Sequence, residues 1–575
     1  MRVVVQADEG ATVGPQGGDH LAALRWGLVV VSCCLLTALV ATWPLAANLM
    51  RAIPLGNEQG AMVGLFSIWT LWWNADRLAH GFAGYWDAPV FFPNKGVFTY
   101  SEPEPLTSLV VAPLWGLNAP PALILNLAFL LILTLNGVFA YRLSRALAAT
   151  RLGSLLAGIL MVALPFVAKV YGVLNLTPLF GLLWTLDGLV RFGKSGSLRH
   201  AAWAGLGFVV AYLTCQQYAL IFAPFALLAG LVALSEQRFG WRPLLRLTGS
   251  GLVAGLLLLP LILPVYSLHQ RLGLARQDFV VERLSASLGD FFTRPNTASL
   301  PLPTATLEDT GGLFPGLIVL ALAVTGGVLG WQGREQRRWI GYLVGSVLLA
   351  AVLAMGLKLG GGYSPLGVLR AVVPGFGELR SPFRFAVIMQ VMMVVLAALA
   401  LTHLASRLGR RGPGLILLLT LLGAAENLNV PVPLLGVPLT PATGWSSWIL
   451  SQPASMVVAH VPFPNGLGIR DYEGEGWRML AQIDHHQPIV NGYSGYFPPS
   501  YTRFQLQMAR LFPQRDLLCV LGKDLRVNTL VLDQAWLREH QAAMATFASF
   551  LQPAYADQDV QVVRLQIPMG ECQLV

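Results

Sequence analysis

The chain has 575 residues, of which 55% are hydrophobic and 12% are charged, and its formal net charge is +9 at pH 7. Soluble domains carry roughly 25% charged residues, so this composition excludes an ordinary soluble protein. The basic residues gather in alternate short loops between apolar runs, a pattern that reflects membrane topology and gives no sign of nucleic-acid binding. We therefore expect a polytopic α-helical membrane protein whose surroundings are membrane lipid.

Apolar runs of the length needed to cross roughly 30 Å of hydrocarbon recur along the chain. The closely spaced runs 202–215 and 217–235 are kept as two spans, because one long tilted helix would break the alternation of basic loops. About 11 spans result: 27–47, 121–141, 152–170, 174–190, 202–215, 217–235, 247–267, 312–331, 339–357, 385–405 and 413–429.

Five alternate loops carry the excess of Lys and Arg, near residues 142–151, 191–199, 238–246, 334–338 and 407–411. Because basic loops stay in the cytoplasm, the N-terminus is expected inside and the C-terminus outside. The segment 1–26 contains acidic residues such as Asp8 and Glu9, unlike the basic start of a cleavable signal, so the first span is predicted to be an uncleaved anchor.

Three regions follow from this layout: a cytoplasmic segment 1–26, a transmembrane domain 27–429 that includes a long first outer loop 48–120, and an outer domain 430–575. Further outer loops are expected at 268–311 and 358–384. The C-terminal region is less hydrophobic and is predicted to be a small α/β domain, with strands near 455–463, 526–533 and 559–567 and helices near 501–512 and 535–551. Within it, Cys519 and Cys572 either pair or stay as free thiols.

The stretch 55–77 begins with one carboxylate, Glu58, and continues as a tryptophan-rich helical pattern. Trp69, Trp72 and Trp73 share one side of that helix, which favours a position in the membrane interface. An alternative is that Asn57 caps the helix and Glu58 only complements its dipole.

More carboxylates follow in the first outer loop. Asp87, Glu102 and Glu104 stand among aromatic residues and prolines in residues 84–106, where the prolines keep the chain extended. Aromatic faces beside carboxylates are suited to binding sugars. The alternative is a solvated loop with an aromatic interfacial anchor.

The outer loop 358–384 has the opposite charge. Lys358, Arg370, Arg380 and Arg384 are opposed only by Glu378, which departs from the usual bias toward basic inner loops. Arginine forks bind phosphate oxygens, so Arg380 and Arg384 indicate a phosphate or pyrophosphate site. Contact with anionic lipid, or with the acidic first loop, would explain the charge equally well.

Five motifs, in this order, resemble the GT-C superfamily of membrane glycosyltransferases, and most closely its bacterial multispan members with a C-terminal extracytoplasmic domain. The matching stretches are Trp69–Ala75, Tyr85–Pro93, Ser101–Pro103, Leu379–Phe385 and Pro488–Pro498. The last overlaps "NGYSGYFPP", residues 491–499, which is expected to be an aromatic turn that docks the outer domain or contacts a saccharide.

The resemblance implies an enzyme that moves a sugar from a polyprenyl-phosphate carrier to an acceptor outside the bacterial cytoplasmic membrane, whether a cell-surface glycan, a lipid or a protein. The family places an acidic catalytic residue, usually Asp, soon after the first span, and Glu58 holds that place here. Arg380 and Arg384 would bind the carrier phosphate.

The remaining substrate-binding candidates come from the first outer loop. They are the carboxylates Asp87, Glu102 and Glu104, which bind the acceptor or a divalent cation, and Trp69 and Trp73, which set the depth of the site at the membrane surface. No residue is assigned to a metal, and metal dependence stays open.

Two other functions fit the sequence less well. A transporter or flippase of lipid-linked saccharides usually has ionisable residues near the bilayer midplane, whereas the charges here lie mostly in outer loops. A non-catalytic membrane scaffold with a degenerate site is the third possibility, because Glu replaces the usual Asp.

Overall fold

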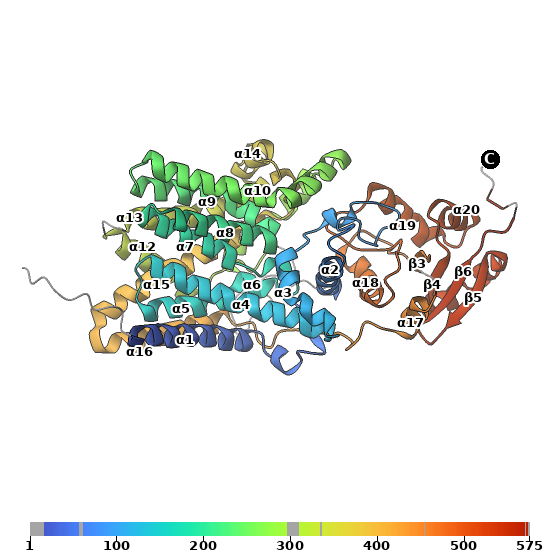
Figure 1. Cartoon of the computed structure of the whole chain (residues 1–575), viewed down its shortest axis with the longest axis horizontal. Helices are drawn as coiled ribbons and strands as arrows, with labels where there is room; N and C mark the ends of the chain where they lie inside the picture. The colour runs from blue at the N-terminus through green and yellow to red at the C-terminus, as the bar shows by residue number, and fades with distance from the viewer. Residues whose placement is uncertain are drawn as a thin grey trace, which may run out of the picture.

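The computed structural model describes residues 17–56, 61–295, 310–333, 336–452, 455–569 and 571–572. Most helices form a large body in which they run along the long axis of the molecule, and a smaller part that contains a sheet lies at one end (Figure 1). The smaller part is built from the C-terminal region, and α2 of the first outer loop lies against it (Figure 1). The predicted class, a polytopic helical protein with a C-terminal α/β domain, is confirmed.

The body and its outer loops contain α1 (Gly17–Ala41), β1 (Ala52–Pro54), α2 (Ala61–Ala79), α3 (Pro105–Gly116), α4 (Pro121–Ala146), α5 (Arg151–Val162), α6 (Pro165–Lys169), α7 (Phe180–Ser195), α8 (Leu198–Thr214), α9 (Gln216–Glu236), α10 (Trp241–Leu272), α11 (Asp278–Arg283), α12 (Leu317–Trp331), α13 (Arg337–Ala354), α14 (Pro365–Val372), α15 (Ala386–Leu408) and α16 (Gly412–Asn427). Short 3-10 turns that matter for the site are η2 (Val97–Tyr100), η7 (Phe376–Glu378) and η8 (Pro382–Phe385). The C-terminal region contains β2 (Leu434–Gly436), α17 (Gly444–Leu450), β3 (Val458–Val461), α18 (Glu473–His485), α19 (Pro499–Leu511), α20 (Arg515–Cys519), β4 (Thr529–Asp533), α21 (Gln534–Ala545), β5 (Leu551–Ala556) and β6 (Val560–Leu565).

Every predicted span coincides with at least one helix. Among the described residues, seven helical segments are long and apolar enough to cross a membrane, and one of them covers both α15 and α16. The helices α7, α8 and α12 are shorter, at 16, 17 and 15 residues. The figure of 11 spans therefore stays a prediction.

The predicted break inside 202–235 is present. Cys215 is extended, with φ −155° and ψ 101°, between α8 and α9. The side chain of Gln237, just after α9, donates to the carbonyl of Gly193 in the last turn of α7, which leads into α8. The two helices therefore form a hairpin that returns to the end of the body where it began.

Prolines account for two differences from the predicted spans. The run 152–170 is divided into α5 and α6, because Pro165 cannot continue a helix and instead opens the next one. The run 174–190 begins with a short 3-10 turn and becomes α-helical only at Phe180, after Pro178. Hydropathy alone cannot detect such interruptions, since the flanking residues stay apolar.

The centre of the body is α15, in which every side chain from Ala386 to Leu401 is buried. Its one strongly polar residue in that run, Gln390, accepts a hydrogen bond from the Phe166 amide and donates to the Leu313 carbonyl. A buried amide that is satisfied on both sides costs little, and it ties α15 to α6 and to the segment before α12.

The two ends of the body differ in charge. At one end the basic loops contact each other, because Arg246 donates to the Gly196 carbonyl and Arg338 donates to the Ser235 carbonyl. At the other end the outer loops meet the C-terminal region, for example where β1 pairs with β2 in antiparallel fashion. Which end faces the cytoplasm stays a prediction.

The C-terminal sheet has the strand order β3-β4-β6-β5, with β3 parallel to β4 and the other pairs antiparallel. The three strands and two helices predicted here are present, and β5 was missed. Apolar residues fill β3, β4 and much of β6, whereas β5 is half exposed at the edge. A half-exposed edge strand has weak hydrophobic alternation, so its sequence gives little signal.

Candidate active site

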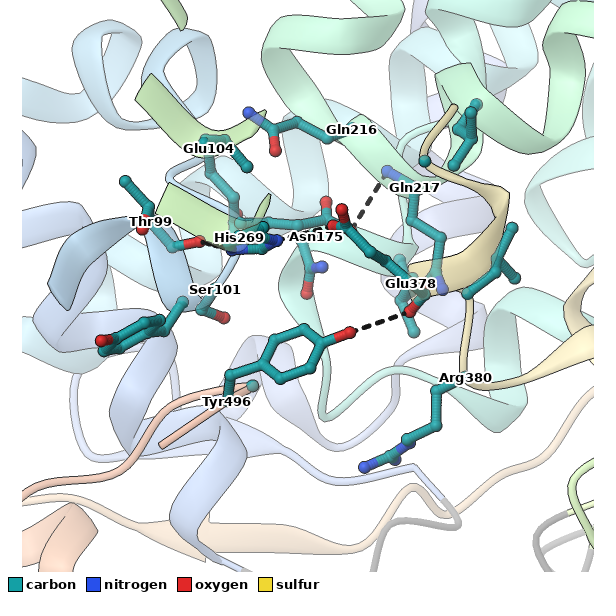
Figure 2. A pocket seen from close by; sticks show the side chains of 18 of the residues that line it. Thr99, Ser101, Glu104, Asn175, Gln216, Gln217, His269, Glu378, Arg380 and Tyr496 are labelled. Atoms are coloured by element: carbon teal, nitrogen blue, oxygen red, sulfur yellow. Dashed lines mark hydrogen bonds and ion pairs between the residues drawn. The ribbon is translucent and has the colours of Figure 1, made fainter. Parts of the chain in front are cut away.

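A cavity of about 460 Å³ lies where the outer loops meet the C-terminal region. Its walls come from six parts of the chain: α2, the segment 99–104, the segment 173–176, the α8–α9 turn, the end of α10 with the residues after it, and the segment 374–384. Ile469 and the loop 493–496, both in the C-terminal region, close the cavity. Figure 2 shows its polar side chains.

Two carboxylates form an acidic side of this cavity. Glu102 accepts a hydrogen bond from the backbone amide of Gln217, 3.2 Å away. Burial raises the pKa of Glu102, while hydrogen bonds and the nearby Arg384 oppose the shift. Glu104 precedes Pro105 in a left-handed conformation, φ 46°, and its Oε2 is buried without a hydrogen-bond partner among the described residues.

Burial, and then the charge of Glu102, raise the pKa of Glu104 well above its ordinary value. A carboxylate with no positive partner is costly in a dry environment and takes up a proton instead. The pair thus combines a carboxyl group that is readily protonated with one that sits beside an arginine. Such pairs are typical of sites that perform acid-base chemistry.

Two arginines form the basic side. The guanidinium of Arg384 donates to Gln217 Oε1, so Gln217 contacts both the basic and the acidic side. Arg380 also lines the cavity, and among the described residues it has no hydrogen-bond or ion-pair partner. Figure 2 shows its side chain without any contact to the other residues drawn.

The other two basic residues of the same loop are engaged elsewhere. Arg370 forms an ion pair with Asp278 at 2.9 Å, and the Lys358 ammonium donates to Ser287 Oγ at 2.9 Å. Neither lines the cavity. Two of the four basic residues of this loop therefore hold the structure together, and the other two, Arg380 and Arg384, line the cavity.

The C-terminal region contributes the aromatic turn expected from "NGYSGYFPP". Arg276 lies 3.6 Å from the ring centre of Tyr496 and donates to the Gly495 carbonyl. A Cβ added to Gly495 would lie 2.9 Å from the Tyr100 carbonyl oxygen, so this turn sits directly on the first outer loop. The prediction that it docks the outer domain is confirmed.

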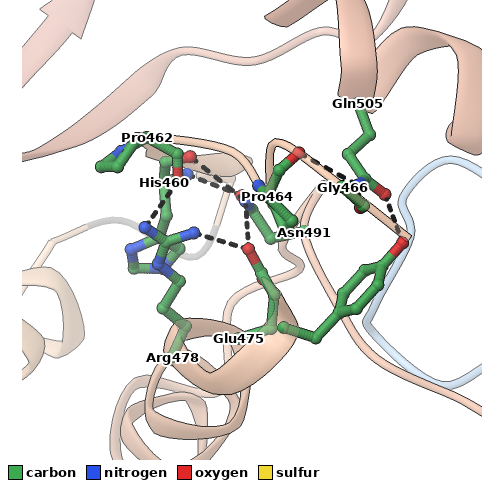
Figure 3. Close-up of polar contacts among 9 residues, drawn as sticks. His460, Pro462, Pro464, Gly466, Glu475, Arg478, Asn491 and Gln505 are labelled. Atoms are coloured by element: carbon green, nitrogen blue, oxygen red, sulfur yellow. Dashed lines mark hydrogen bonds and ion pairs between the residues drawn. The ribbon is translucent and has the colours of Figure 1, made fainter. Parts of the chain in front are cut away.

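A polar network inside the C-terminal region holds this turn in place (Figure 3). The buried Glu475 accepts hydrogen bonds from Arg478 at 2.6 Å and from Asn491 at 3.3 Å. Gln505 donates to two carbonyls of the loop 464–466, each 3.0 Å away. Because 464–466 leads to Ile469 and Asn491 leads to 493–496, the network positions both loops that close the cavity.

The tryptophan helix is not a membrane anchor, and that prediction is wrong. Trp69 and Trp73 are 1% and 4% exposed. Trp69 Nε1 donates to Gln482 Oε1 of α18 at 2.9 Å, and Trp73 Nε1 donates to the Tyr85 carbonyl at 3.0 Å. The apolar face of α2 packs on protein, and neither tryptophan lines the cavity.

Asp87 also lies outside the cavity. Its Oδ1 accepts a hydrogen bond from the Gly96 amide at 2.8 Å, and Lys95 lies 3.5 Å from Oδ2. Its carboxylate shapes the loop between two aromatic segments. Of the three outer-loop carboxylates predicted to bind substrate, the structure brings Glu102 and Glu104 together with Arg380 and Arg384 and leaves Asp87 apart.

Glu58 lies outside the described residues, so its role as the catalytic carboxylate stays a proposal. Val63 of α2, five residues further along the chain, lines the cavity.

In the described part of the chain, no group of three His, Cys, Asp or Glu side chains is placed to hold a metal ion. Glu102 and Glu104 with a substrate phosphate would still suit Mg²⁺, which commonly uses one or two carboxylates and phosphate oxygens. The raised pKa of Glu104 opposes binding of a cation, because a carboxyl ligand has to be deprotonated. A divalent cation therefore stays a proposal.

Several polar residues of the cavity were not assigned to the site from the sequence, among them Arg276, His269 and Gln217, and Glu378 was noted there only as an opposing charge. The predicted span 247–267 stops two residues before His269. An ionisable residue at the outer end of an apolar span is a signal that could have been used. The convergence of the others is decided only by packing.

Several solved structures have a similar architecture. The arabinofuranosyltransferase AftD from Mycobacteria matches with a TM-score of 0.58 and 16% identity, over 95% of this chain and 40% of its own. The oligosaccharyltransferase AglB from Archaeoglobus fulgidus matches with 0.46 and 12% identity over 95% and 75%. ArnT from Cupriavidus metallidurans, in a structure bound to undecaprenyl phosphate, matches with 0.46 and 14% identity over 94% and 98%.

The AftD match shows that the protein has the fold of the GT-C membrane glycosyltransferases, as its motifs predicted. The chain spans about 40% of the length of AftD. No curated protein matches its sequence. The chain belongs to the family described as "Domain of unknown function (DUF6311)", whose profile matches residues 88–425, more than half of its length.

Proposed function

We propose that this protein transfers a sugar from a polyprenyl-phosphate carrier to an acceptor outside the cytoplasm. The observation that carries the proposal is that Arg380, Arg384, Glu102 and Glu104 line the same cavity. One side of this cavity is apolar and comes from α10, with Ile262, Val265 and the 46% exposed Tyr266. A phosphate with a long hydrocarbon tail needs this combination of a cationic end and an apolar approach.

In the proposed reaction the acceptor hydroxyl attacks the anomeric carbon of the sugar. The bond between that carbon and the phosphate oxygen breaks, and the carrier leaves as polyprenyl phosphate. A carboxylate takes the proton of the hydroxyl, and we assign this role to Glu58. Arg380 and Arg384 offset the charge that grows on the phosphate as it leaves.

Glu102 has a different place in this scheme. It accepts a hydrogen bond from the backbone amide of Gln217, whose side chain accepts one from Arg384, and so it helps to orient the phosphate-binding group and binds the acceptor or a cation. Burial and the charge of Glu102 raise the pKa of Glu104, and we assign to its protonated form a hydrogen bond donated to a sugar oxygen or an acceptor oxygen. Glu102 would also be the next candidate for the base.

The test is Glu58→Gln in the full chain, reconstituted in liposomes and assayed with a panel of radiolabelled undecaprenyl-phosphate sugars. The amide is nearly isosteric but cannot accept the proton, so transfer should fall by on the order of 100-fold or more while thermal stability stays near that of the wild type. Asp87→Asn is the matched control, because its carboxylate belongs to the same loop and lies outside the cavity.

If Glu58→Gln transfers the sugar as fast as the wild type, Glu58 is not the base. Glu102→Gln would then be tested in the same assay. A wild type that transfers none of the sugars but moves a lipid-linked saccharide across the bilayer would contradict the enzyme and support the transporter. A scaffold would show neither activity.

We also propose that the cavity and the C-terminal region face the outside of a bacterial cytoplasmic membrane. The basic loops contact each other at the opposite end of the body, and Cys519 and Cys572 form a disulfide, which persists mainly in oxidising compartments. A C-terminal alkaline phosphatase fusion should be active and a C-terminal green fluorescent protein fusion dark. The reverse pattern would overturn this topology.

A further inference from the structure

His269 occupies a special place at the outer end of α10. It is 5% exposed, yet both of its ring nitrogens contact oxygen atoms. Nδ1 lies 2.6 Å from Glu378 Oε2, and Nε2 lies 2.9 Å from the Thr99 carbonyl oxygen. The Tyr496 ring packs against the imidazole edge with ring centres 5.3 Å apart, and its hydroxyl donates to the Glu378 carbonyl at 3.3 Å (Figure 2).

The two contacts of this histidine join the two chemically opposite sides of the cavity. Thr99 lies three residues before Glu102 and five before Glu104 on one short segment. Glu378 lies two residues before Arg380 and six before Arg384 on another. Through its two nitrogens, His269 therefore fixes the distance between the acidic segment 99–104 and the basic segment 378–384.

The bridge requires a particular number of protons. A carbonyl oxygen only accepts, so Nε2 must donate its proton to Thr99. Nδ1 and the carboxylate of Glu378 then need a second proton between them. Without that second proton, the lone pair of Nδ1 would face the lone pairs of the carboxylate, and the two groups would repel each other.

We propose that His269 and Glu378 form a positioning pair that holds the acidic and basic segments of the cavity in register only while it keeps this second proton. The effect of this pair on sugar transfer rests on the proposed function. The bridge between the two segments rests only on the distances from His269 to Glu378 and Thr99. Opening of the bridge at alkaline pH would separate Glu102 from Arg380 and Arg384. Misplacement of reacting groups by about 1 Å costs on the order of 100-fold in rate.

Other charged and titratable groups face the same pair. Arg276 and Arg380 lie on the segments that flank it, and burial lowers the pKa of Arg276. Tyr496, whose pKa burial raises to about 12, stays neutral over the range of interest. Glu102 and Glu104 line the cavity as well, so a pH profile of the wild type alone would not assign the proton.

Two variants separate the proton from the bridge. In Glu378→Gln the new amide donates to Nδ1 of a neutral His269, so the bridge persists without the second proton. In His269→Phe the ring volume stays and both hydrogen bonds are lost. Asp278→Asn is the control, because it breaks the 2.9 Å ion pair with Arg370 on the same outer surface without touching the bridge.

The first readout is hydrogen exchange of the full chain in nanodiscs, without substrate, from pH 6 to pH 10. After correction for the intrinsic base-catalysed rate, exchange in 97–104 and 376–384 should rise with pH in the wild type and in Asp278→Asn. It should stay flat and low in Glu378→Gln, and it should be high at every pH in His269→Phe. Wild-type exchange in His269→Phe, or an unchanged pH dependence in Glu378→Gln, would overturn the proposal.

The second readout is transfer from an undecaprenyl-phosphate sugar. Turnover should fall on the order of 100-fold in His269→Phe, and the decline of the wild type at alkaline pH should be absent from Glu378→Gln. Equal alkaline decline in both proteins would also count against the pair. Since hydrogen exchange needs no substrate, it decides the bridge even if no sugar is transferred and the proposed function fails.

Discussion

Replacement of Arg384 by lysine tests the phosphate site most directly. Arg384→Lys keeps the positive charge and loses the planar fork that contacts Gln217 and faces Glu102. A hydrogen bond to a charged group contributes about 1.5–3 kcal/mol, so loss of one such bond to a phosphate should weaken binding about 10- to 150-fold. The lysine still fits the cavity, and folding should survive.

Binding is measured with undecaprenyl phosphate added to the protein in nanodiscs, at two salt concentrations, by native mass spectrometry. Arg370→Lys is the matched control, because Arg370 belongs to the same outer loop but is engaged by Asp278 and does not line the cavity. It should bind the carrier as the wild type does. Higher salt should weaken all variants by a similar factor, since the charge is kept.

Equal binding by Arg384→Lys and Arg370→Lys would refute the assignment. It would mean that the excess positive charge of the loop attracts anionic lipid in a general way. A drop in both variants would have the same meaning, because one of the two arginines is outside the cavity. Only a selective loss at Arg384 supports a built phosphate site.

Three further outcomes are expected. Because the raised pKa of Glu104 means that the folded state holds a proton which the unfolded state has released, this group should lower wild-type stability above pH 4.5 by up to about 1.4 kcal/mol per pH unit, and thermal unfolding of Glu104→Gln should show a smaller decline than the wild type. Trp69→Phe should cost about 1–3 kcal/mol and speed hydrogen exchange in α18, since Gln482 Oε1 loses its buried donor; unchanged exchange would contradict that docking role. Cys572→Ser should lower the stability of the C-terminal region by about 2–4 kcal/mol through loss of the bond to Cys519, and non-reducing gel mobility would first verify the bond.

The helices show how far a sequence pattern reaches. Each predicted span became a helix, because a long apolar run can satisfy its backbone only internally in lipid. The two-span hairpin of α8 and α9 followed from the alternation of basic loops. The helix starts were less accurate where Pro165 and Pro178 interrupt runs that are apolar throughout.

The helix α2 shows where such a pattern fails. Its periodicity correctly predicted a helix with one apolar face, but the partner of that face was wrong. Trp69 is buried against Gln482, 413 residues further along the chain. Hydrophobicity measures the preference for leaving water and does not distinguish lipid from protein as the destination.

The sequence by itself determined the membrane class of this protein, its GT-C motifs, and the acidic and basic character of two outer loops. It named Glu102, Glu104, Arg380 and Arg384, because unusual charge in an outer loop is visible without coordinates. Only the tertiary structure decided that these four share one cavity and that Asp87 does not. The reason is that the joining contacts, such as His269 with Thr99 and Glu378, link positions 170 and 109 residues apart, where packing and not local sequence sets the distance.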